Sequence, residues 1–154
     1  MPLLAEHYGL EVRVVQSPVT AIADAPGRIE VVCDLVVRNS GRRPVTRVSA
    51  ILYRLLMVSE ATDARDPQRR LKVRQAVRAL PEESRLQVNA ITVELVEPLA
   101  PGATTTLRLA YAGTPVGYRE VMPYVHDAVQ PSIAVLRPEI LWYPVLGAPT
   151  LQTY

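Results

Sequence analysis

The sequence contains few side chains of the kinds that bind metals or act as nucleophiles. Its two histidines, His7 and His126, lie far apart in the 154 residues. A zinc peptidase site needs two histidines one helical turn apart, with a further ligand and a general base. Neither histidine has that spacing to another ligand. The sequence therefore predicts no metal site and no cofactor-binding site in this piece.

His126 is followed directly by Asp127. A carboxylate beside a histidine can orient the imidazole as a general base. The simpler reading is a solvated pair in a short polar turn, because no serine or cysteine has a partner that would make it a nucleophile. Glycine-rich phosphate-binding motifs are also missing from the sequence. We therefore predict no catalytic residue and no enzyme activity for this piece alone.

The one cysteine, Cys33, lies in an apolar run with Val31, Val32, Leu35 and Val36. A single cysteine cannot form an internal disulfide. A thiol becomes reactive in an exposed, electropositive setting, whereas an apolar run favours burial. We predict that Cys33 is a buried and unreactive thiol.

Four arginines form a basic stripe at positions Arg69, Arg70, Arg74 and Arg78. Such a stripe can bind nucleic acid or another anionic surface. Acidic residues lie close by in the sequence and no aromatic residues are interleaved for base stacking. We predict a solvent-facing strand with no nucleic-acid partner. The alternative is that this face docks on the remainder of a larger protein.

The composition favours a single all-β domain. Hydrophobic residues make up 49% and charged residues 21% of the chain, which is enough to bury a core. Fourteen prolines and seven glycines along the chain fit many short strands and turns. We predict an antiparallel β-sandwich or saddle-like β-domain with at most one short helix.

The segment Val88–Gly113 contains two strand patterns around one turn. Apolar residues alternate with polar ones on both sides of the break, as in strands with one buried face. Pro98, Pro101 and Gly102 predict a turn between them. The segment is therefore a β-hairpin or a corner between two sheets.

Other elements are predicted from the same periodicity. Alternation predicts strands over residues 7–16 and 28–38, and the continuous apolar run over 45–58 predicts a central strand. Residues 59–68 are polar and predict an exposed loop. Residues 69–80 favour a strand over a helix, with Leu71, Val73 and Val77 facing inward.

Prolines interrupt the chain after Gly113. Residues 118–129 predict a short helix or an irregular turn. Short strands are expected around 133–136 and 140–143, and a further strand is expected to begin at 150–154. Trp142 is expected to be a core anchor.

The order of alternating strand, Pro-Leu, Pro-Gly, threonine-rich strand and Leu-x-Leu-x-Tyr-x-Gly resembles a known family. It is similar to the amino-terminal β-domain of zinc aminopeptidases of the aminopeptidase N type. The Tyr-x-Gly here is Tyr111 to Gly113, and the aromatic-Pro segment expected about thirty residues later is matched by Leu141 to Pro144.

The resemblance implies that residues 1–154 are one β-domain of a larger chain, cut near Tyr154. Zinc would then lie in a missing downstream catalytic-type domain of the same chain. Peptide substrate would bind at the cleft between the two domains. The family's Thr-Gln-x-Glu and Asp-Glu-Pro segments are missing from the corresponding region, so no site residue is transferred. Glu139 lies nearby and is interpreted as a surface or capping carboxylate.

A second hypothesis is a free-standing immunoglobulin-like module that binds a protein or glycan. It differs from the first in needing no downstream domain. No apolar run reaches the length of a membrane span, so we expect a soluble domain. The compartment is not fixed by the sequence, and an extracytoplasmic part of a membrane-anchored protein is one alternative.

Overall fold

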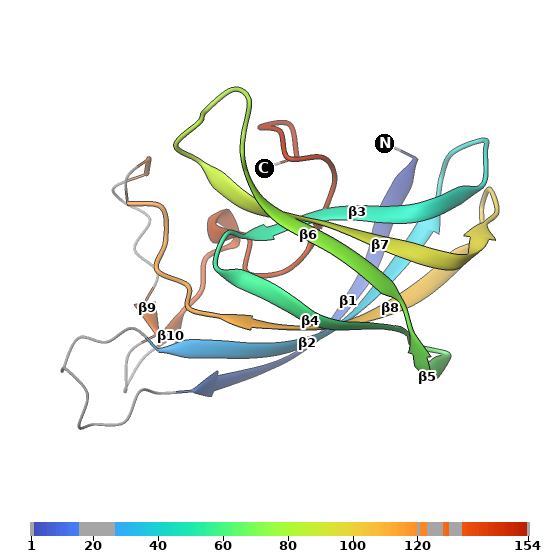
Figure 1. Cartoon of the computed structure of the whole chain (residues 1–154), viewed down its shortest axis with the longest axis horizontal. Helices are drawn as coiled ribbons and strands as arrows, with labels where there is room; N and C mark the ends of the chain where they lie inside the picture. Colours follow the sequence, from blue (N-terminus) through green and yellow to red (C-terminus); the bar gives the residue numbers. More distant parts are fainter. Residues whose placement is uncertain (1, 16–26, 120, 123–127, 130–133, 154) are drawn as a thin grey trace.

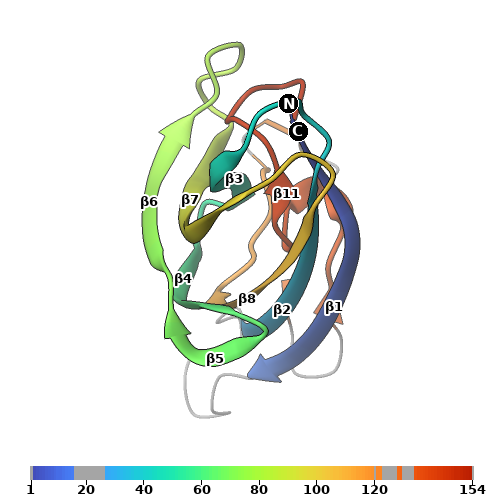
Figure 2. The ribbon, with the colours of Figure 1, turned by 90° about the vertical axis from the view of Figure 1, so that its right-hand side faces the viewer.

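The computed structural model describes residues 2–15, 27–119, 121–122, 128–129 and 134–153. It confirms an all-β domain with two main antiparallel sheets (Figure 1). Figure 2 shows β6, β7 and β3 on one side of the domain and β2 and β1 on the other. The short helix is a single 3-10 turn, η1 (Pro138–Ile140).

The larger sheet has five strands in the order β1 (Leu3–Val15), β2 (Arg28–Asn39), β8 (Thr104–Gly113), β4 (Leu56–Asp63) and β5 (Asp66–Arg70). The second sheet has four strands in the order β11 (Val145–Leu146), β3 (Val45–Tyr53), β7 (Gln87–Leu99) and β6 (Lys72–Ala79). A small pair is formed by β10 (Ala134–Val135) and β9 (Ala128–Val129). The chain therefore changes sheet repeatedly.

The core lies between the two main sheets. In β2 every second residue from Ile29 to Val37 is buried, as the alternation over 28–38 predicts. In β8 the same alternation holds from Thr105 to Tyr111. Strand β8 pairs with β2 and β4, whereas β7 pairs with β3 and β6. The segment Val88–Gly113 is therefore a corner between sheets and not a hairpin.

The prediction of one strand over residues 45–58 is wrong. The chain turns at Arg54 and Leu55, so β3 lies in the four-stranded sheet and β4 in the five-stranded sheet. The predicted loop over 59–68 is also wrong, because β4 continues to Asp63 and β5 follows. All five residues of β5 are exposed, so its polar composition reflects an edge strand.

Three smaller predictions also differ from the structure. Val77 is 46% exposed, because it lies on the edge strand β6 and not in the core. The strand expected over 140–143 is replaced by η1 and an irregular stretch. Strand pairing begins only at β11, which pairs with β3. Residues 150–153 form turns, and the Thr153 amide donates to the Thr150 carbonyl.

The strand predicted over 69–80 is confirmed over residues 72–79 as β6, whereas residues 69 and 70 belong to β5 in the other sheet. Tyr118 begins an irregular turn, in which the amides of Val121 and Met122 both donate to its carbonyl oxygen. The remainder of the predicted 118–129 element lies mostly outside the described residues.

Two buried asparagines hold the corners between the sheets. The Asn39 side-chain amide donates to the Leu99 and Arg43 carbonyls, both at 2.8 Å. The Asn89 amide donates to the Leu56 carbonyl at 2.7 Å. Both asparagines are fully buried. They supply hydrogen bonds where the chain leaves the regular ladder.

We expect Gly113→Ala to destabilise the domain. A β-carbon on Gly113 would overlap the carbonyl oxygen of Leu55 at the β3–β4 corner. Overpacking against backbone should lower the free energy of unfolding by about 3 kcal/mol, measured by urea denaturation. Gly9→Ala is the matched control, because its β-carbon meets Asp34 at an ordinary 3.6 Å. Equal losses in the two variants would contradict this account of the corner.

Candidate functional site

The segment from Arg137 to Leu146 is attached to both sheets. Its strand β11 pairs with β3, with Val145 opposite Ile51 and Leu146 opposite Ala50. The Tyr53 amide donates to the Leu141 carbonyl at 2.8 Å. The segment is therefore held in one position on the domain, which suits a surface that must present side chains in fixed directions.

Leu141 has an unusual backbone conformation. Its φ of 57° is in the left-handed region, and it is the one non-glycine residue with positive φ among the described residues. This conformation costs about 1–2 kcal/mol for a residue with a β-carbon. The Leu141 amide donates to the Pro138 carbonyl at 2.9 Å, and the side chain is buried. These contacts hold the reversal of chain direction after η1.

Two tyrosine hydroxyls of the five-stranded sheet reach the same segment. The Tyr111 hydroxyl donates to the Trp142 carbonyl at 3.1 Å, and the Tyr8 hydroxyl donates to the Pro144 carbonyl at 2.9 Å. The Tyr143 ring lies edge-on to the rings of Tyr8 and Trp142. The distances between ring centroids are 5.6 Å to Tyr8 and 5.3 Å to Trp142. The structure thus brings together the two sequence motifs that carry the family resemblance.

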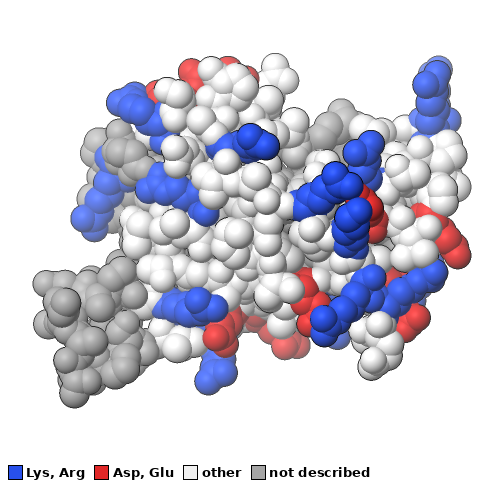
Figure 3. All heavy atoms as spheres, in the orientation of Figure 1, with Lys and Arg blue, Asp and Glu red and all other residues white. Residues whose placement is uncertain are grey.

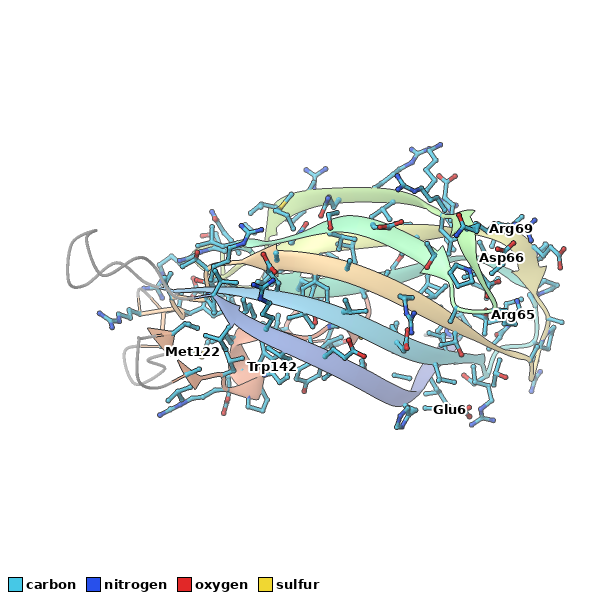
Figure 4. All side chains as sticks on the ribbon, turned by 90° about the horizontal axis from the view of Figure 1, so that it is seen from below. Glu6, Arg65, Asp66, Arg69, Met122 and Trp142 are labelled. Atoms are coloured by element: carbon cyan, nitrogen blue, oxygen red, sulfur yellow. The ribbon has the colours of Figure 1, made fainter. Side chains whose placement is uncertain are left out.

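Trp142 is partly buried and packs against the core. It is thus an anchor at the edge of the core. Its indole nitrogen is buried and has no hydrogen-bond partner within the part of the chain that the structure describes. Figure 4 shows Trp142 and Met122 at one end of the domain and Arg65, Asp66 and Arg69 at the other. The two groups are therefore separate surfaces.

The titratable groups beneath the segment are held in their neutral forms. Burial, with a smaller contribution from Asp34, raises the pKa of the Cys33 thiol to about 12. Burial, with contributions from Cys33 and Tyr143, raises the pKa of Tyr8 to about 12. Burial also raises the pKa of Tyr111. The prediction of a buried thiol is confirmed, and its high pKa opposes nucleophilic chemistry.

The remaining candidate residues do not meet at one place. His7 is exposed on β1, and Glu139 is exposed on η1, in agreement with a surface carboxylate. His126 and Asp127 lie outside the described residues. Among the residues that are described, no three His, Cys, Asp or Glu side chains form a group that could hold a metal ion. The described residues therefore do not fit a zinc site.

The four arginines of the predicted stripe are all exposed, but they lie on two strands in different sheets. Arg70 of β5 pairs with Glu60 at 3.3 Å, and Arg74 of β6 pairs with Glu94 at 3.1 Å. The predicted solvent exposure of the four arginines is confirmed, but their placement on one strand is wrong. In the described part of the chain, no helix is long and apolar enough to span a membrane.

Sequence reasoning missed the tyrosine hydroxyls and the Leu141 conformation. Tyr111 was found as part of a motif, but its role of binding the Trp142 carbonyl depends on a contact between residues far apart in sequence. A groove between β4 and β6 was also missed, because the residues of β4 were divided between the strand predicted over 45–58 and the loop predicted over 59–68. The one sequence signal that pointed to this groove was the alternation of residues in β6, which predicted a strand with one inward face.

Comparison with solved structures confirms the resemblance to zinc aminopeptidases. An M1 zinc metallopeptidase from Deinococcus radiodurans is 28% identical, with a TM-score of 0.54 over 75% of this chain and 21% of that chain. A two-domain M1 zinc metallopeptidase mutant bound to L-arginine is 26% identical, with a TM-score of 0.54 over 84% of this chain and 24% of that chain. The chain thus spans about a quarter or less of each relative. No protein-family model and no curated protein matches the sequence.

The high pKa of Cys33 predicts a loss of stability at alkaline pH. In the unfolded chain the thiol has its ordinary pKa of 9.0, whereas burial in the folded chain raises the pKa to about 12. The stabilising contribution is therefore complete below pH 9 and is lost as the pH rises towards 12. This contribution is measured as the difference in free energy of unfolding between the native chain and Cys33→Ala, from urea denaturation at pH 8, 9.5 and 10.5. We expect the native chain to lose its stability advantage over the variant as the pH rises, and parallel curves would contradict the burial of a neutral thiol.

Proposed function

We propose that residues 1–154 form a noncatalytic β-domain of a larger protein of the M1 zinc metallopeptidase type. Its role is structural: it packs beside a catalytic domain that lies outside this sequence and shapes one wall of a peptide-binding cleft. The observation that carries the proposal is the structural match, which covers most of this chain but only about a fifth to a quarter of each peptidase.

The segment Arg137–Leu146 is the best candidate for the wall of the cleft. In the resembled family one substrate-pocket residue comes from the Thr-Gln-x-Glu segment shortly before the aromatic-Pro motif, and the corresponding region of this chain includes Arg137–Leu146. It also carries the left-handed Leu141, and strained backbone is common at functional sites. The hydroxyls of Tyr8 and Tyr111 hold it from below. A wall held in this way can orient a bound peptide without taking part in the chemistry.

The proposal assigns the zinc to the downstream domain, because the described residues offer no suitable ligand group. One related structure holds a Tyr-Ser-Ala substrate, and a short peptide is accordingly the class of substrate proposed for the complete protein. The alternative is a free-standing interaction module, which needs neither zinc nor a downstream domain.

The first experiment compares the 154-residue chain with the complete natural protein. We expect the complete protein to bind about one zinc per chain and to release amino acids from short peptides. We expect the 154-residue chain to do neither. A complete protein without bound zinc and without peptidase activity would contradict the peptidase proposal and favour the interaction module. Hydrolysis by the 154-residue chain would contradict a noncatalytic role.

A second experiment tests whether the segment shapes the cleft. Tyr111→Phe in the complete protein removes the hydrogen bond to the Trp142 carbonyl and leaves the core otherwise filled. We expect KM to rise about threefold with kcat unchanged, because substrate positioning is loosened by about 1 kcal/mol or less. Tyr118→Phe is the matched control, because the Tyr118 hydroxyl donates to the Gln87 carbonyl and not to the segment. Equal kinetic effects in the two variants would contradict the role of the segment.

A further inference from the structure

Strand β6 forms an open edge of the four-stranded sheet. Its eight residues pair with β7 on one side, from Lys72 opposite Glu94 to Ala79 opposite Gln87. Beyond that ladder, the backbone groups of residues 72–79 bond to no other strand in the described part of the chain. One side-chain contact crosses to β4, where Gln75 binds the backbone of Val58. Alternate backbone groups of an edge strand point away from its neighbour and can pair with an added strand.

The outer face of this edge is positively charged. Lys72, Arg74 and Arg78 share one face of β6, since residues two apart point the same way. The register places Lys72, Glu94 and Arg47 side by side across three strands. Glu94 is the one acid of this group and pairs with both Lys72 at 3.5 Å and Arg74 at 3.1 Å. Four bases thus face one acid.

Figure 3 shows basic side chains spread over this side of the molecule, with fewer acidic ones between them. Arg78 and Arg47 make no ion pair with a described residue. The uncompensated charge favours a partner with carboxylates.

The inner face of the same edge borders a groove. Strands β4 and β6 approach each other near β5 and separate towards the other end of β6 (Figures 1 and 2). The groove between them has a volume of about 290 Å³. Its apolar lining residues are Val58, Ala61, Leu71 and Val73, and its polar ones are Ser59, Glu60, Arg70 and Gln75. Val77 follows on the same face and is 46% exposed. Small aliphatic side chains would find apolar contacts on the Val73 and Val77 side of this space.

We propose that β6 binds an extended acidic polypeptide segment as an added edge strand. Backbone hydrogen bonds to β6 give the affinity. Carboxylates on one face of the segment meet Arg74 and Arg78, and aliphatic side chains on the other face enter the groove beside Val73 and Val77. This inference is independent of the proposed peptidase relationship, because it rests on the sheet edge, the charges and the groove alone.

Nucleic acid fits this surface less well than an acidic peptide. In the described residues, no exposed aromatic side chain lies on β3, β6 or β7, so bases have no stacking platform. The open backbone edge also matches a polypeptide, which alone offers a regular row of amide donors and carbonyl acceptors.

The test uses a fluorescent peptide of four Glu-Val repeats and the 15N-labelled chain. All glutamates of such a strand share one face, and all valines share the other. We expect binding in a titration, with amide shifts in NMR spectra confined to residues 72–79 and the facing part of β4. Shifts elsewhere, or no binding, would overturn the proposal.

Two controls separate a strand ladder from simple charge attraction. Peptides N-methylated on every glutamate or on every valine block opposite edges of the added strand, so one pattern should abolish binding and the other should preserve it. The double variant R74E and R78E should weaken binding about tenfold, whereas Arg13→Glu on β1 should not change it. Equal binding of both methylated peptides, or tighter binding of an oligouridylate at β6, would overturn the proposal.

Discussion

The backbone of this domain must find hydrogen-bond partners wherever the chain passes from one sheet to the other. At such corners the regular ladder ends, and an unpaired buried carbonyl or amide costs about as much as a lost hydrogen bond. Asn39 meets this need at the end of β2, where its side chain binds the Leu99 carbonyl and accepts from the Gly41 amide. The Asn89 side-chain amide likewise donates a hydrogen bond to the Leu56 carbonyl at the start of β4. The sandwich therefore depends on two buried carboxamides as well as on its apolar core.

The sequence predicts the strands well where one face is buried. Strands β2 and β8 alternate strictly because they lie in the middle of the larger sheet and meet the core on one side only. The β3–β4 corner escaped prediction because Arg54 and Leu55 are not turn-forming residue types. The residue that makes room for the corner is Gly113, which is distant in sequence and acts through the space beside Leu55. Corners fixed by distant residues cannot be read from a local pattern.

The candidate site was predicted only as two separate motifs. The Tyr-x-Gly motif and the aromatic-Pro motif are about thirty residues apart, and no periodicity links them. The structure joins them through the Tyr111 hydroxyl and the Trp142 carbonyl. The conformation of Leu141 could not be predicted either, because leucine does not favour positive φ. It is imposed by tertiary contacts, namely the buried side chain and the bond from the Tyr53 amide.

The two sides of the sandwich are closed differently, and this explains the open edge. On one side the Tyr8 hydroxyl joins β1 to the segment beside β11. On the other side the Gln75 side chain both donates to and accepts from the backbone of Val58, at 2.7 and 2.9 Å. This contact joins β6 to β4 at one point, beyond which the strands separate. The basic residues of β6 oppose pairing between two copies of the chain, since like charges would face each other. The same charges favour the acidic segment proposed above. The positive charge of β6 would therefore both prevent edge-to-edge association of two copies and select the partner.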